Sequence, residues 1–106
     1  MAHPNPIPAR LKTARTKAGI TQRELGIRIG MEPSSASGRM NHYEKGRHIP
    51  DIDTLKRMAD ELGVPLNYFF CESETTAELV CLIARLTEAE QNELIAILKK
   101  SNHSSL

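Results

Sequence analysis

The stretch ITQRELGIRIGMEPSSASGRMNHYEKG, residues 20–46, holds the signals that decide the fold. Thr21 and Glu24 have the T-x-x-E spacing of a capping box, in which two side chains satisfy free amide groups at a helix start. The helix that begins there should end at Gly30, because glycine readily adopts the backbone conformation that closes a helix. Pro33 suits the first turn of a following helix, where a missing N–H is tolerated. We therefore expect two short helices joined by a tight turn.

The second of these helices, about residues 33–45, has one apolar side and one small polar side. Ala36, Met40 and Tyr43 recur at the spacing of a core-facing stripe. The outer side would carry Ser34, Ser35, Ser37, Gly38, Asn41 and His42. Small polar side chains let a helix enter the major groove of DNA and offer hydrogen bonds to base edges. Taken alone, the stretch fits a solvated helix surface equally well.

Apolar spacing predicts three more helices between residues 7 and 70 and two after residue 73. Their apolar residues are Ile7, Leu11, Ala14 and Ala18 in the first helix, Leu55, Met58, Ala59 and Leu62 in the fourth, and Leu66, Phe69 and Phe70 in the short fifth. Aromatic residues make up 4% of the chain and Trp is absent, which disfavours a sheet-rich fold. The expected fold is all-α, with five helices followed by two C-terminal helices.

Two stretches carry a resemblance to a known family: LKTARTKAGITQRELGIRIG at residues 11–30 and YEKGRHIPDIDTLKRMADELGVPLNYFF at residues 43–70. They resemble the λ-repressor-like helix-turn-helix regulators, in which R-x-x-x-G-(L/I)-T-Q-x-x-L-A, E-x-G-x-x-x-P and L-x-x-(L/M)-A-x-x-L-x-V follow one another. Several motifs in the right order are more specific than any one of them. The resemblance covers roughly residues 7–70 and implies a DNA-binding domain.

The resemblance also implies roles for individual residues. Gln22 matches the glutamine that contacts phosphate and braces the recognition helix, and Arg15 and Glu44 match a buried ion pair. Lys45 and Arg47 fall in the loop that lies along the phosphate backbone in this family. The expected DNA contacts are Thr21, Gln22, Arg23, Ser34, Ser35, Ser37, Gly38, Arg39, Asn41, His42, Lys45 and Arg47.

Two features depart from the family pattern. The distance from Gly30 to Glu44 is longer by roughly one helical turn, and Gly26 replaces the usual alanine. The longer helix leaves two registers for base contacts. One uses Ser37, Gly38, Asn41 and His42 and is favoured because Met40 and Tyr43 anchor that end; the other uses Ser34, Ser35 and Arg39.

The charge is divided between the two halves of the chain. Through Arg57 there are eleven Lys and Arg against five Asp and Glu, a net of +6, and the remainder carries three against eight, a net of −5. The front half can attract a polyanion such as DNA, whereas the rear half cannot. Scattered solvated charge would give the same totals.

Other functions find little support. The longest apolar run, residues 79–84, is far shorter than the roughly 20 residues of a membrane span, and no signal peptide is recognised, so a cytoplasmic protein is expected. Cys71 and Cys81 have no CxxC or metal-ligand spacing, which predicts reduced thiols, no metal and no cofactor. Glu88, Glu90 and Glu93 have no paired base, so an enzyme is not expected.

The two C-terminal helices carry more apolar surface than they can cover between themselves. The apolar side chains in question would be covered by packing against a second copy of the chain: Leu79, Leu82, Ile83, Leu86, Leu94, Ile97 and Leu98. The alternative is that the two helices fold back onto the first five helices of the same chain. The expected organisation is a flexible leader at 1–6, a DNA-binding domain at 7–72, a dimerisation segment at 73–100 and a flexible tail at 101–106. We predict a homodimeric repressor that binds palindromic double-stranded DNA; the alternative is an antitoxin or adaptor with a protein partner.

Overall fold

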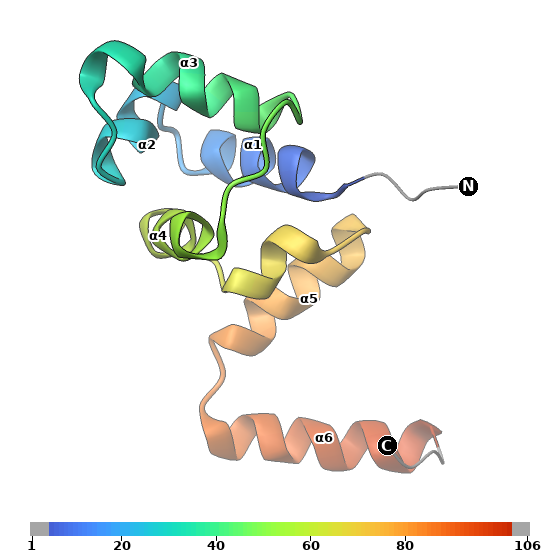
Figure 1. Cartoon of the computed structure of the whole chain (residues 1–106). Helices are drawn as coiled ribbons and strands as arrows, with labels where there is room; N and C mark the ends of the chain where they lie inside the picture. Colours follow the sequence, from blue (N-terminus) through green and yellow to red (C-terminus); the bar gives the residue numbers. More distant parts are fainter. Residues whose placement is uncertain (1–4, 103–106) are drawn as a thin grey trace.

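The computed structural model describes residues 5–102, and within them the chain forms helices and no strands (Figure 1). The elements are α1 (Ile7–Lys17), α2 (Gln22–Arg28), α3 (Pro33–Glu44), α4 (Ile52–Leu62), the 3₁₀ helix η1 (Leu66–Phe70), α5 (Glu74–Ala84) and α6 (Glu88–Asn102). The all-α prediction is confirmed. No helix among these residues is long and apolar enough to cross a membrane.

Side chains fix the starts of several helices. The Thr21 hydroxyl accepts the backbone N–H of Glu24 at 3.0 Å, as the T-x-x-E spacing predicts. At α6 the capping box is complete: the Glu90 carboxylate accepts the backbone N–H of Thr87 at 2.9 Å, and the Thr87 hydroxyl accepts that of Glu90 at 3.2 Å. Asp51 accepts a backbone N–H in the first turn of α4 at 2.8 Å, and this hydrogen bond lowers the pKa of its carboxyl group.

The first four helices and η1 close one apolar core. Its largest fully buried side chains are Phe69, Leu11, Leu25, Met40, Leu55 and Met58. The expected fifth helix is a 3₁₀ helix, and one of its predicted core residues is wrong: Phe70 is 46% exposed, whereas Tyr68 is buried. A 3₁₀ helix has about three residues per turn, so Leu66 and Phe69 share a side and Phe70 does not.

The two C-terminal helices differ in how they relate to this core. Helix α5 packs on η1 and places Ala77 in the core, whereas α6 lies apart from the first four helices (Figure 1). The radius of gyration is 16.1 Å. A compact domain of this length would have about 13 Å. The side-chain amide of Gln91 donates to the carbonyl of Ile83 at 2.9 Å and joins α6 to the end of α5.

The expected flexible ends differ partly from the structure. Helix α6 continues through Asn102, two residues into the segment predicted as a tail. At the other end, the Asn5 side chain accepts the backbone N–H of Ile7 at 3.0 Å. The rest of the predicted leader, residues 1–4, and of the tail, residues 103–106, lie outside the described residues.

Candidate nucleic-acid interface

Helices α2 and α3 meet at unusually short range. A Cβ atom added to Gly26 would lie 2.8 Å from the Cβ of Ala36 and 3.2 Å from its Cα. Gly30, in the turn between the helices, has φ +100°, which L side chains rarely adopt. The close approach explains why glycine replaces the usual alanine at position 26.

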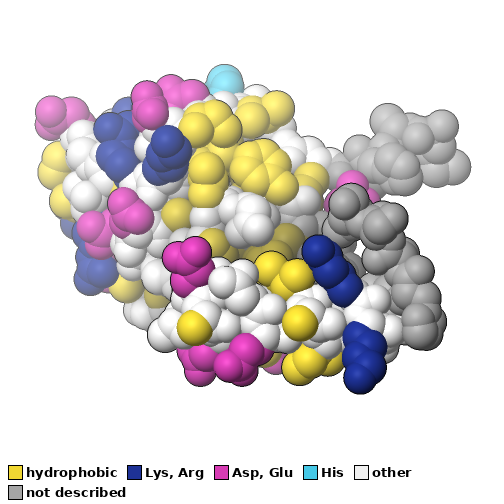
Figure 2. All heavy atoms as spheres, turned by 90° about the horizontal axis from the view of Figure 1, so that it is seen from below, with side chains coloured by type: hydrophobic (Ala, Val, Ile, Leu, Met, Phe, Trp, Pro, Cys, Tyr) yellow, Lys and Arg dark blue, Asp and Glu magenta, His cyan; other side chains and the backbone are white. Residues whose placement is uncertain are grey.

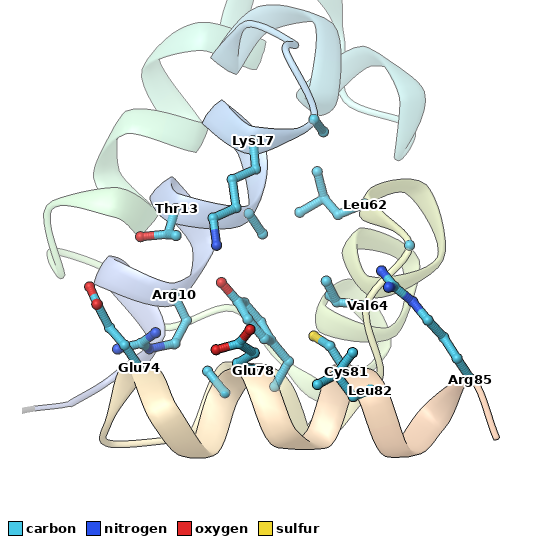
Figure 3. A pocket seen from close by; sticks show the side chains of 15 residues that line it. Arg10, Thr13, Lys17, Leu62, Val64, Glu74, Glu78, Cys81, Leu82 and Arg85 are labelled. Atoms are coloured by element: carbon cyan, nitrogen blue, oxygen red, sulfur yellow. The ribbon is translucent and has the colours of Figure 1, made fainter.

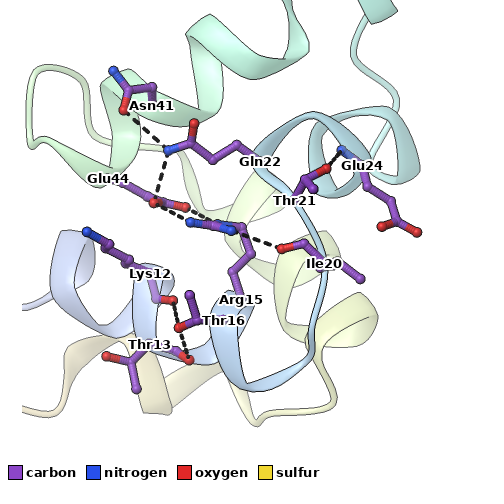
Figure 4. Close-up of polar contacts among 10 residues, drawn as sticks. All are labelled: Lys12, Thr13, Arg15, Thr16, Ile20, Thr21, Gln22, Glu24, Asn41 and Glu44. Atoms are coloured by element: carbon purple, nitrogen blue, oxygen red, sulfur yellow. Dashed lines mark hydrogen bonds and ion pairs between the residues drawn. The ribbon is translucent and has the colours of Figure 1, made fainter.

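A buried ion pair ties α3 to α1. The Nε of Arg15 lies 2.6 Å from Oε2 of Glu44, and its Nη2 donates to Oε1 at 3.1 Å (Figure 4). A third donor, Nη1, reaches the carbonyl of Ile20 at 2.9 Å. The Arg15 side chain is 12% exposed and that of Glu44 3% exposed. Arg15 and Glu44 therefore meet where the sequence pattern placed them, and Arg15 also holds the segment between α1 and α2.

Gln22, the first residue of α2, joins this network to the last turn of α3. Its Nε2 donates to Oδ1 of Asn41 at 3.2 Å and to Oε1 of Glu44 at 3.1 Å (Figure 4). Because the Asn41 oxygen accepts from Gln22, the Asn41 amide group turns its NH₂ away from the network, as Figure 4 shows. Gln22 thus fixes which polar atoms α3 presents outward.

The outer side of α3 is a row of small polar residues. Ala36, Met40 and Glu44 are buried at helical spacing, so the opposite side of the helix faces outward. The expected contacts on α3 are either exposed, namely Ser34, Ser35, Ser37, Gly38 and Arg39, or half-buried, namely Asn41 and His42. Both predicted registers lie on this one continuous helix.

Basic residues lie at the start of α2 and directly after α3. Lys45 and Arg47 are exposed in the turn after α3, and Arg23 is exposed in the first turn of α2 beside the cap Thr21. The rings of His42 and His48 lie 5.3 Å apart, and with Arg39 and Tyr43 they line a hollow of about 310 Å³. Sequence reasoning missed His48, although its position directly after Arg47 in the basic loop could have indicated it.

A comparison with protein-family models matches residues 11–69 to the helix-turn-helix model. This chain belongs to the helix-turn-helix family. The matched residues contain α2, the turn, α3 and α4, together with the later part of α1 and all but the last residue of η1. The family consists of DNA-binding transcriptional regulators.

Individual relatives of this helix-turn-helix protein agree with the assignment. The transcriptional regulator ImmR of Bacillus subtilis (strain 168) is 31% identical over 67 residues, which are 63% of this chain and 50% of ImmR, so the chain spans half of that relative's length. The phage CTXφ transcriptional repressor RstR of Vibrio cholerae is 24% identical over 96 residues, 86% of this chain and 83% of RstR. The crystal structure of the transcriptional regulator BswR matches with a TM-score of 0.80 at 39% identity, covering 89% of this chain and 93% of that one.

The C-terminal helices of this helix-turn-helix protein carry an uncovered apolar surface. Leu79, Leu82, Ile97 and Leu98 are 48–63% exposed, and Ile83, Leu86 and Leu94 are partly covered. Ile95, which was not among the predicted residues, is 47% exposed. Figure 2 looks onto α6 and shows hydrophobic side chains along it, with acidic ones beside them and two basic ones toward its end.

Proposed function

We propose that the protein is a sequence-specific regulator of transcription, most simply a repressor, that binds a palindromic operator in double-stranded DNA as a homodimer. It acts in the cytoplasm, without catalysis or a resident cofactor. Residues 7–72 bind DNA and residues 73–100 join the two copies. The observation that carries this proposal is the exposed small polar row on α3, held in place by a buried network on the other side of the same helix.

The geometry of α3 suits the major groove. An α-helix with its side chains is about 10–12 Å across, and the groove of B-DNA is about 12 Å wide. Serine and glycine add little to the width of the helix, so its backbone can approach the bases closely. The Asn41 NH₂ and the His42 imidazole then face base edges, while Lys45 and Arg47 lie beside phosphates.

Selection of bound duplexes from a random pool tests the DNA-binding part. We expect one enriched half-site repeated with two-fold symmetry, with half-site centres about 34 Å apart or a multiple of that distance. Asn41→Ala or His42→Ala should relax the preference at one or two base pairs, each by about 1–3 kcal/mol. Failure of the full chain to enrich any duplex would overturn the proposal.

Dimerisation is inferred from the uncovered apolar residues of α5 and α6. A single module covers little DNA, and joining two modules raises affinity by about 100-fold or more without any new contact. Ile97 is the most exposed of the predicted dimer residues, at 63%, so a substitution there tests dimerisation most directly. A carboxylate at that position would have to be desolvated in an apolar interface.

Sedimentation of the wild-type chain and of Ile97→Glu tests the dimer. We expect twice the chain mass for wild type and a single chain mass for the variant. Asn92→Glu is the matched control, because it places the same charge about 140° around α6 from Ile97. A monomeric wild type that instead forms a stable complex with a different protein through α5 and α6 would favour the adaptor or antitoxin alternative.

A further inference from the structure

A cavity of about 600 Å³ lies between the DNA-binding helices and α5 (Figure 3). Its walls come from α1, from the end of α4, from η1 and from α5. Much of the lining is apolar, including Ala14, Leu62, Val64, Ala77 and Leu82. Sites for small molecules are typically cavities of about 300–1,000 Å³ with apolar walls and a few polar groups. The cavity has the size and lining of such a site.

Arg10, in the cavity wall, has a buried nitrogen without a hydrogen-bond acceptor among the described residues. Arg10 is 9% exposed, and its Nε has no hydrogen-bond partner among the described residues. That nitrogen is enclosed by protein atoms, so an acceptor that enters the cavity would meet the other N–H groups of the same guanidinium and form charge-assisted hydrogen bonds with them. Figure 3 shows Arg10 at one end of the cavity, between α1 and the first turn of α5.

Four other charged side chains also line the cavity. Lys17 and Arg85 are basic, Glu74 and Glu78 are acidic, and all four side chains are exposed. Water screens these exposed charges, whereas the charge of buried Arg10 is screened much less. With Arg10, the lining carries three basic and two acidic side chains, so its net charge is +1.

Tyr68 lies close to Arg10. Burial raises the pKa of its hydroxyl, and the nearby charge of Arg10 acts in the opposite direction. Tyr68 also lines the cavity, so a neutral hydroxyl stands beside the guanidinium. Together they can bind an anionic group from two sides.

We propose that this cavity binds a small amphipathic anion, whose charged group pairs with Arg10 and whose apolar body lies against Val64, Leu82 and their apolar neighbours. The anion would bridge α1 of the DNA-binding domain and α5. Since α5 leads into α6, the occupied cavity would fix how the two parts are joined. That consequence for DNA binding rests on the function proposed above, whereas the binding site does not.

Titration of the ¹⁵N-labelled full chain, followed by NMR, tests the site directly. The probes are naphthoate, the neutral naphthamide and the cationic naphthylmethylamine, which share a similar ring body and differ in charge. We expect naphthoate to shift the amide signals of residues around the cavity and to bind about tenfold or more tightly than either control. Equal or tighter binding of the amine, or no shifts around the cavity with any probe, would overturn the proposal.

Substitution of Arg10 tests the role of its charge. Arg10→Met keeps a long side chain in the buried position and should weaken naphthoate about tenfold or more, without weakening naphthamide. The control is Lys12→Met, an exposed position on the same helix and outside the cavity lining, which should leave naphthoate binding unchanged. If Arg10→Met does not fold, the relative affinities of the three probes for the wild-type chain decide whether the cavity prefers an anion. Neither experiment involves DNA or requires a dimer, so failure here is distinguishable from failure of the proposed function.

Discussion

The inner side of α3 contacts the rest of the protein, whereas its outer side is exposed. On the inner side, contacts within the protein account for each residue: Ala36 packs within reach of Gly26, and Glu44 pairs with Arg15. On the outer side, serine, glycine and basic side chains are exposed and have no packing role in the described part of the chain. Substitutions on the inner side should therefore lower stability, whereas those on the outer side should weaken DNA binding without lowering stability.

The largest expected effect is at Arg15. Arg15→Ala removes a buried charge and strands Glu44, which should lower the free energy of unfolding by about 3–5 kcal/mol. Urea denaturation followed by circular dichroism measures this change. The control is Arg28→Ala, which breaks the exposed Arg28–Glu24 pair and should cost at most about 1 kcal/mol. Similar losses in both variants would show that burial of the inner pair does not matter.

A smaller loss is expected at Gly26. In Gly26→Ala the new methyl group would lie 2.8 Å from Ala36, so the two helices must move apart, at a cost of about 1–3 kcal/mol. The double variant Gly26→Ala with Ala36→Gly removes the clash while keeping one methyl group in the interface. We expect it to be more stable than the sum of the single changes predicts. Simple additivity would show that the two positions do not collide.

Local signals in the sequence were enough to predict most of this fold. A side-chain cap such as Thr21 bonds to a residue within one helical turn, so the spacing of the two residues in the sequence is enough to predict the hydrogen bond. The positions of Phe70 and Tyr68 could not be read in this way, because an α-helical period does not apply to a 3₁₀ helix.

The candidate site was predictable only in part. Motifs matched from the family placed Arg15 opposite Glu44, and the structure brings them together. The hydrogen bond from Gln22 to Asn41 depends on how the longer α3 lies against α2, which no local pattern encodes. The need for Gly26 likewise depends on the distance between two helices, and sequence alone showed only that the position departs from the pattern.

On the outer side, Gly38 should behave in the opposite way to Gly26. A Cβ at this position would meet nothing within 4 Å in the described part of the protein, so Gly38→Ala should gain about 1 kcal/mol of stability from helix propensity. We expect the same methyl group to weaken binding to the selected duplex, because it would stand between the helix backbone and the bases. Thermal unfolding and a duplex titration measure the two effects. A more stable variant with unchanged affinity would mean that this part of α3 does not approach DNA.

The smallest effect on stability is expected at Lys45, which is exposed in the turn after α3. Lys45→Ala should leave the free energy of unfolding within about 0.5 kcal/mol of wild type. It should weaken all duplexes similarly and flatten the slope of log affinity against log salt by about 0.9, the loss of one phosphate contact. Lys99→Ala, in the last turn of α6, should leave the slope unchanged because α6 and α3 lie on opposite sides of the molecule (Figure 1). Equal changes of slope in both variants would mean that the protein's overall charge, rather than the turn after α3, sets the response to salt.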